Sequence, residues 1–152
     1  MKYYLDTEFN GFGGELLSLA LVREDNFSLY IIYEFNGTSY EPWVKENVVP
    51  IMYAIPGIPR LWFKEIDNLT GANAIRAFLQ DDKTPHIISD WPDDIRYFCQ
   101  SIITGPGMMV SIPQLDFSIR RVDAYPTTLE NAVQHNALWD AYALKTLLEG
   151  RP

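Results

Sequence analysis

The N-terminal part of the chain alternates apolar runs with short polar turns, a pattern that predicts three consecutive β-strands. The apolar and aromatic runs cover residues 1–8, 15–22 and 27–35, and glycine-rich or charged turns separate them. Strands joined by such short turns usually pair antiparallel with their neighbours in the chain. We therefore expect an antiparallel meander of three strands at the start of the fold.

The next part of the chain carries helix signals. Pro42 suits the first turn of a short helix over 43–49, which Pro50 ends. Thr70 reads as the N-cap of a helix over 71–79, whose apolar residues recur on one face. The stretch between these helices contains several prolines, and we interpret its residues 51–63 as an irregular apolar connector.

The C-terminal half alternates brief strands with helices. The predicted elements are a buried strand over 86–89, a turn and helix over 90–103, a strand over 108–110, a polar link over 122–127 and a last helix within 129–148. The chain order is then β-β-β-α-α-β-α-β-α. This order predicts an α/β fold: a mixed sheet in which the meander is extended by parallel strands, flanked by α-helices.

Length and composition narrow the class of protein. The 152 residues are enough for one domain with a full core, and no repeat or linker divides them, so we expect a single domain over 1–152. The apolar runs are strand-sized, and no basic stretch followed by an apolar one opens the sequence. We therefore expect neither a membrane segment nor a signal peptide. The single cysteine, Cys99, excludes an intramolecular disulfide and fits a cytoplasmic protein, in which it is expected to be a buried small apolar residue.

The net charge of −8 argues against broad electrostatic binding of long duplexes. It does not exclude nucleic acid as a substrate, because acids that hold metal ions present a positive site to phosphate once the ions are bound. The sequence leaves the oligomeric state open, a homodimer included.

Asp6 and Glu8 are the first candidates for chemistry, at the end of the first predicted strand. Side chains of a strand alternate between its faces, so both carboxylates point one way and Thr7 points the other. Two neighbouring carboxylates repel each other, and a hard cation such as Mg²⁺ or Mn²⁺ between them removes that cost. By itself such a pair is more often a solvated turn than a metal site.

A second group of acids, Asp90, Asp93 and Asp94, directly follows the predicted strand over 86–89. Sites in open α/β sheets collect at such strand-to-helix crossings. The alternative is that these carboxylates cap the following helix and interact with its dipole.

His135 and Asp140 form the third candidate pair, in the last predicted helical segment. Five residues correspond to about 140° of rotation on a continuous helix, so the two side chains would not share a face. They converge more easily if His135 lies in a loop or at the helix start and Asp140 lies one turn inside. Taken alone, such a histidine is more often a surface or packed residue than a catalytic base.

These residues, in this order, resemble the three motifs of the DEDDh 3′–5′ exonucleases, a family that includes oligoribonuclease, RNase T and polymerase proofreading subunits. Asp6-x-Glu8 resembles the first motif, Asp94 and the helix after it the second, and His135-x₄-Asp140 the third. The segment HNALWDAYAL is the most specific piece, and the resemblance covers almost the whole chain. The length and spacing are most similar to small stand-alone exoribonucleases of the kind described from mycobacteria.

The middle motif departs most from the family pattern. The family usually carries a small or amide residue about four or five positions before its aspartate, and here Ser89 or Asp90 occupies that place. We assign Asp94 to the motif. Asp93 and Asp90 remain alternatives if the turn differs from this interpretation.

The resemblance implies an RNase H-like fold and a 3′–5′ exoribonuclease that acts on single-stranded RNA or RNA overhangs and releases nucleoside 5′-monophosphates. It implies two Mg²⁺ or Mn²⁺ ions held by the four acids, with His135 as the base that takes a proton from the attacking water. Phe9, Phe12 and Trp91 flank the motifs and could stack on terminal bases, with core packing as the alternative. A 3′–5′ exodeoxyribonuclease and a non-catalytic RNase H-like nucleic-acid-binding module are the alternative functions.

Overall fold

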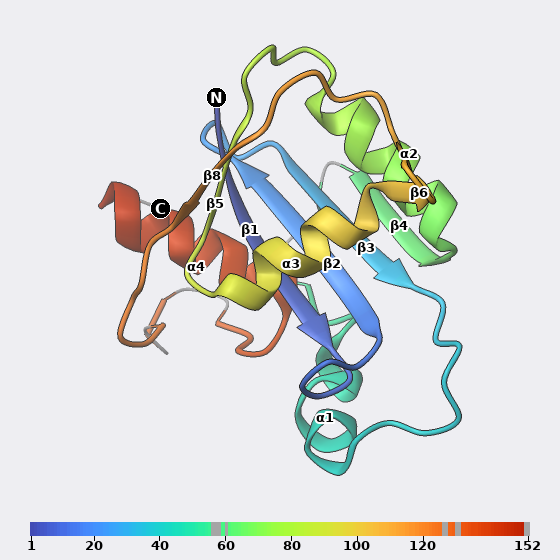
Figure 1. The fold of residues 1–152 in the computed structure, drawn as a ribbon. Helices are drawn as coiled ribbons and strands as arrows, with labels where there is room; N and C mark the ends of the chain where they lie inside the picture. Colours follow the sequence, from blue (N-terminus) through green and yellow to red (C-terminus); the bar gives the residue numbers. More distant parts are fainter. Residues whose placement is uncertain (56–58, 60, 126–127, 130–131, 151–152) are drawn as a thin grey trace.

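The computed structural model describes residues 1–55, 59, 61–125, 128–129 and 132–150. A six-stranded mixed sheet lies at the centre of the described chain (Figure 1). Its strands are β1 (Lys2–Phe9), β2 (Leu16–Arg23), β3 (Ser28–Tyr33), β4 (Leu61–Ile66), β5 (His86–Ser89) and β8 (Asp116–Ile119). The spatial order is β4-β3-β2-β1-β5-β8.

The first three strands pair antiparallel, as the short turns between them predict. On one side of this meander β4 adds parallel to β3, and on the other side β5 and then β8 add parallel to β1. The predicted fold class, a mixed sheet in which an antiparallel meander is extended by parallel strands and flanked by helices, is therefore confirmed.

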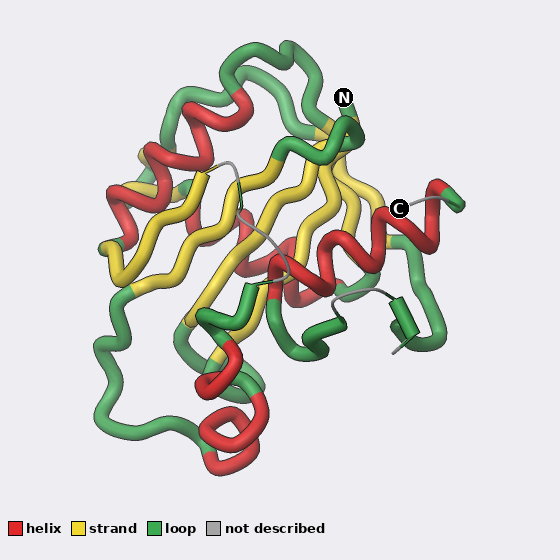
Figure 2. Tube along the Cα trace, turned by 180° about the vertical axis from the view of Figure 1, so that it is seen from behind, coloured by secondary structure: helices red, strands yellow, loops and turns green. Residues whose placement is uncertain are grey.

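Helices cover both faces of the sheet and one of its ends. They are α1 (Pro42–Asn47), the 3₁₀ turn η1 (Val49–Ile51), α2 (Asn68–Leu79), α3 (Pro92–Ser101) and α4 (Ala137–Glu149). In Figure 1, α2 and α3 cross the near face of the sheet, and α1 lies beyond the end toward which β1 points. Figure 2 shows the opposite face, which α4 crosses. No helix in the described part of the chain is long and apolar enough to span a bilayer.

The alternation of β1 side chains places the two halves of the core. Tyr3 and Leu5 are fully buried with Phe78 and Phe98 under α2 and α3. Tyr4 is buried on the other face with Leu144 of α4. Asp6 and Glu8, which share the parity of Tyr4, therefore belong to the α4 face. Cys99, expected to be a buried small apolar residue, is half-buried and packs against the core under α3.

The stretch before α2 departs from the sequence prediction. Residues 61–66, expected within an irregular connector or just after it, form β4, because Leu61, Trp62 and Phe63 continue the sheet by pairing with β3. The helix that follows begins three residues before the predicted start. Its N-cap is Asp67, whose Oδ1 accepts the Thr70 backbone N–H at 2.8 Å, so the prediction of Thr70 as the N-cap was wrong.

The predicted strand over 108–110 is also displaced. Its first two residues form β7 (Met108–Met109), which pairs with β6 (Ile103–Gly105) in a small hairpin outside the main sheet. The strand that extends the main sheet is β8, which the sequence analysis did not predict. Its four residues alternate polar and apolar positions too briefly to stand out from a loop.

Candidate metal centre

Carboxylates from three separate segments meet at the end of β1. Oxygen atoms of Asp6, Asp90 and Asp94 lie within 4.8 Å of one another, and so do those of Asp6, Glu8 and Asp140. Asp6 belongs to both groups and therefore joins them into one cluster. The structure thus brings together the four acids that the motifs predict, and it adds Asp90.

The sheet register explains why segments so distant in sequence meet. β1 and β5 are parallel neighbours, with Tyr4 level with Ile88. Continuing that register brings Asp90, just after β5, level with Asp6. The loop and the first turn of α3 then carry Asp94 across the same edge of the sheet, where ligand sites of open α/β sheets usually lie.

Asp94 is held in place by three donors. Its Oδ1 accepts the hydroxyl of Thr7 at 2.6 Å and the Thr7 backbone N–H at 3.2 Å, and its Oδ2 accepts the hydroxyl of Ser89 at 2.7 Å. Thr7 lies between the two acids of β1 and points to the other face, as its position in the strand predicts. The residue between the motif acids therefore orients the acid of the middle motif.

The three aspartates after β5 have different surroundings. Asp94 is 3% exposed and Asp90 is partly buried, and both face Asp6. Asp93 belongs to neither acid group among the described residues and instead pairs with Arg96 at 3.1 Å on the surface of α3. The geometry therefore brings both Asp94 and Asp90 to Asp6 and places Asp93 outside the cluster.

The cluster carries more negative charge than the described residues compensate. Burial raises the pKa of Asp94 to about 7, and it raises that of Asp140 to about 8. Burial, and then the charges of Asp94 and Asp140, hold the pKa values of Asp6 and Glu8 well above their usual range. Asp6 Oδ2 and Asp140 Oδ1 are buried and have no hydrogen-bond partner among the described residues. Oxygen atoms of this kind are suited to hard divalent cations, so the donor set fits Mg²⁺ or Mn²⁺.

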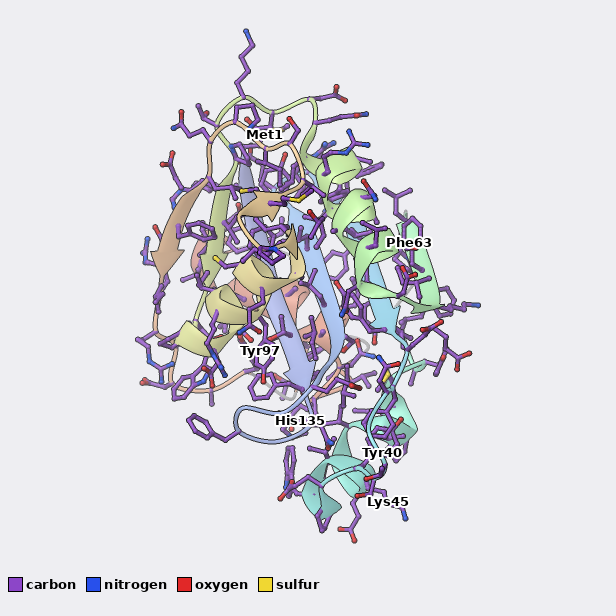
Figure 3. All side chains as sticks on the ribbon, turned by 45° about the vertical axis from the view of Figure 1, so that its right-hand side comes forward. Met1, Tyr40, Lys45, Phe63, Tyr97 and His135 are labelled. Atoms are coloured by element: carbon purple, nitrogen blue, oxygen red, sulfur yellow. The ribbon has the colours of Figure 1, made fainter. Side chains whose placement is uncertain are left out.

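His135 lies in the loop two residues before the first residue of α4, one of the two placements expected from its five-residue spacing to Asp140. It adopts a left-handed backbone conformation with φ 64°. Its side chain is exposed, and its ring packs edge-on against Trp43 of α1 with the ring centroids 5.0 Å apart (Figure 3). The imidazole belongs to neither acid group among the described residues. The structure therefore places His135 beside the cluster with its ring directed to α1.

Asn136 fixes the start of α4 between His135 and Asp140. Its Oδ1 accepts the backbone N–H groups of Leu138 at 3.1 Å and Trp139 at 3.2 Å, and its Nδ2 donates to the Ile51 carbonyl at 3.0 Å. The side chain is 1% exposed, so no water replaces these bonds readily. Asn136 thereby sets the position of both motif residues.

We expect Asn136→Ala to lower the melting temperature by about 2–8 °C, since loss of an N-cap costs about 1–2 kcal/mol and 1 kcal/mol shifts a domain of this size by about 2–4 °C. Asn73→Ala is the matched control, because Asn73 is exposed on α2 and donates only to the Leu69 carbonyl of its own helix. Thermal melts followed by circular dichroism measure both. Equal melting temperatures for the two variants would contradict the capping role.

The three aromatic residues predicted to meet substrate have different environments. Phe9 stacks on Tyr97 with ring centroids 4.5 Å apart, which favours the packing alternative. Phe12 is 95% exposed at the tip of the turn after β1. Trp91 is about half-exposed, and the guanidinium of Arg121 lies 4.6 Å from its ring centroid. Phe12 and Trp91 are thus free to contact a ligand, whereas Phe9 belongs to the scaffold.

Two further residues near the cluster carried no signal in the sequence. A cavity of about 300 Å³ opens beside the acids, and its lining includes Asp6, Asp94, Trp91, Arg121 and Tyr125. Arg121 donates to the Asp90 carbonyl at 2.6 Å. Both residues follow β8, the strand that the sequence analysis did not predict, and only the pairing of β8 with β5 brings them here. A larger cavity of about 640 Å³ lies between β3, β4 and η1, away from the acids.

The raised pKa values predict how stability depends on pH. A carboxyl whose pKa is higher in the folded than in the unfolded chain favours folding at low pH, and that contribution is lost as the pH rises through the folded pKa. For Asp94 and Asp140 the loss runs from about pH 4 to about 7 and 8, respectively. We therefore expect EDTA-treated protein to melt several degrees lower at about pH 8 than at about pH 5.5.

Asp94→Asn should weaken that dependence, because asparagine has no proton to lose, whereas Asp93→Asn should keep it. Added Mg²⁺ should raise the melting temperature most at the higher pH, where the acids are ionised. A melting temperature that rises across this pH range in EDTA would contradict the assigned direction of the pKa shifts.

Comparison of the chain with protein-family models, and separately with curated proteins, found no match.

Proposed function

We propose that this chain is a divalent-metal-dependent 3′–5′ exoribonuclease. It would hydrolyse phosphodiester bonds from the 3′ end of single-stranded RNA or RNA overhangs and release nucleoside 5′-monophosphates. The observation that carries the proposal is the convergence of Asp6, Glu8, Asp94 and Asp140 in one cluster, in which Glu8 is partly buried and the three aspartates are buried. These acids come from three elements, β1, α3 and α4, in the order of the DEDDh motifs. The mixed sheet is consistent with the RNase H-like fold that the same resemblance implies.

The acids would hold two Mg²⁺ or Mn²⁺ ions. Two overlapping groups of ligand oxygens share Asp6, which supports a pair of ions rather than one. When bound, such ions supply positive charge that stabilises the attacking and leaving oxygens of a phosphodiester. Thr7 and Ser89 keep the Asp94 carboxylate turned toward the cluster, and Asp90 provides a further oxygen at its rim.

His135 would take the proton from the attacking water. An imidazole titrates near neutral pH, which suits this task. In the structure its ring rests on Trp43, outside the acid groups. Its exposed side chain precedes the start of α4, and we propose that rotation about its side-chain torsions turns the ring toward substrate.

The surroundings of the acids support a single-stranded substrate. The cavity beside them holds the half-exposed Trp91 ring, and the exposed Phe12 lies in the turn that follows the motif acids of β1. Unstacked bases of single strands bind such aromatic faces. We further propose a cytoplasmic location, which the single free thiol of Cys99 fits.

The test uses single-stranded RNA labelled at its 5′ end. With Mg²⁺ the label should shift down a ladder of ever shorter products, nucleoside 5′-monophosphates should accumulate, and a blocked 3′ end should resist. A DNA oligomer of the same sequence separates the exoribonuclease from a 3′–5′ exodeoxyribonuclease. Tight binding of both oligomers without turnover would instead support a non-catalytic binding module, and rapid cutting of circular RNA would contradict exonuclease action.

A further inference from the structure

β8 lies at one edge of the main sheet and leaves backbone groups open on its outer side (Figure 1). The N–H groups of Asp116 and Arg120 donate to the carbonyls of Pro85 and Ser89, at 3.0 and 2.8 Å, and therefore face β5. Backbone groups of a strand alternate between its two sides, so those of Phe117 and Ile119 face away from β5. In the described part of the chain no residue pairs with them.

The side chains along this edge are also accessible. Phe117 is 38% exposed and Ile119 is 47% exposed, while Asp116 and Arg120 are exposed at either end of the strand. Phe117 rests edge-on against Phe98 of the core, so part of its ring is anchored and part is free. An edge strand with free hydrogen-bonding groups and apolar side chains is a template for another strand.

We propose that a second copy of this chain pairs antiparallel with β8, about a twofold axis through Ser118. The outward groups of Phe117 and Ile119 fix the hydrogen-bonding pattern, because residues that exchange both bonds must present them toward each other. Phe117 of one copy then lies opposite Ile119 of the other. The same register sets Asp116 opposite Arg120 of the second copy and Ser118 opposite itself.

This register is the one in which the edge complements itself. Asp116 and Arg120 of opposite copies face each other at both ends of the paired strands. Phe117 and Ile119 of opposite copies face each other between these ends, on the side of the sheet that carries α3. A shift by one residue would set outward backbone groups against inward ones. A shift by two residues restores the bonds but sets Asp116 or Arg120 opposite Ser118 and so loses the ion pair. A twofold, self-complementary contact of this kind closes as a dimer.

The inference goes beyond the proposed nuclease activity and does not depend on it. Sedimentation velocity across a range of protein concentrations tests it. The native chain should form a dimer, and Arg120→Asp should weaken it about tenfold or more, because two attractive pairs become repulsive. Asp116→Arg should act in the same way. The double variant, Asp116→Arg with Arg120→Asp, should restore the dimer, because each reversed charge again meets its opposite.

Lys45→Asp is the matched control, since it makes the same change in net charge on α1, far from β8 (Figure 3). A native chain that stays monomeric at every concentration would overturn the proposal. So would a dimer that Arg120→Asp leaves unchanged, or a folded double variant that fails to recover.

A cysteine at the proposed axis gives a second measurement if a charge variant fails to fold. Facing residues in the pair without hydrogen bonds have Cα atoms about 4.5 Å apart, within the range of a disulfide. Ser118→Cys should therefore form a covalent dimer under mild oxidation, whereas the native chain, whose only thiol is the half-buried Cys99, should not. Absence of the cross-link in folded Ser118→Cys protein would contradict the register.

Discussion

Asp94→Asn is expected to lower kcat for RNA hydrolysis by at least about 10²-fold, the scale on which loss of one positioned catalytic group acts. The substitution keeps the size of the side chain but removes the negative charge that a divalent cation needs. Asp94 is buried between Thr7 and Ser89 and belongs to the acid group that it forms with Asp6 and Asp90. The Asp94→Asn variant should also be at least as stable as the native chain in EDTA, because the substitution removes one buried charge from a cluster of acids.

Asp93→Asn supplies the control at the neighbouring position. Asp93 has the same chemistry, yet its carboxylate pairs with Arg96 on the surface. Activity should therefore stay within about threefold of native, since breaking an exposed ion pair costs at most about 1 kcal/mol. Comparable losses of activity in Asp93→Asn and Asp94→Asn would mean that the structure is wrong to place Asp94 inside the acid cluster and Asp93 outside it. Unchanged activity in Asp94→Asn would remove Asp94 from the proposed metal centre.

The second large effect concerns His135. His135→Ala should lower kcat by about 10²–10⁴-fold, the usual contribution of a positioned base, with little change in Mn²⁺ affinity. The affinity should hold because the acids, and not the imidazole, form the ligand groups. Steady-state rates at saturating Mn²⁺ check the predicted loss of kcat, and a calorimetric Mn²⁺ titration checks the predicted metal affinity. Loss of metal binding would make His135 a ligand, and an unchanged kcat would make it a bystander.

Much of the fold follows from local rules that the sequence displays openly. Tyr3, Tyr4 and Leu5 are apolar on both sides of β1, and strand periodicity alone assigns Asp6 and Glu8 to one face. The helical angle between His135 and Asp140 likewise favours a place for the histidine in a loop or at the start of the last helix. Such features depend on residues close in sequence, and the structure agrees with them.

The elements that the sequence analysis missed depend on partners far along the chain. β4 and β8 are edge strands: β4 begins inside a stretch rich in prolines, β8 has only four residues, and pairing with β3 or β5 makes them strands. For the same reason the sequence does not predict that Arg121 lies near the acids, because its position depends on the pairing of β8 with β5. Asp90 could not be separated from Asp94 beforehand, because both face Asp6 only in the folded turn.

The measurement that tests the proposed metal centre most directly is a calorimetric titration of EDTA-treated protein with Mn²⁺. We predict about two ions per chain for the native protein and for Asp93→Asn, because two ligand groups share Asp6. Asp94→Asn should lose one ion or bind both more weakly. Absence of Mn²⁺ binding to the folded native chain, or identical titrations for all three proteins, would contradict a metal centre formed by these acids.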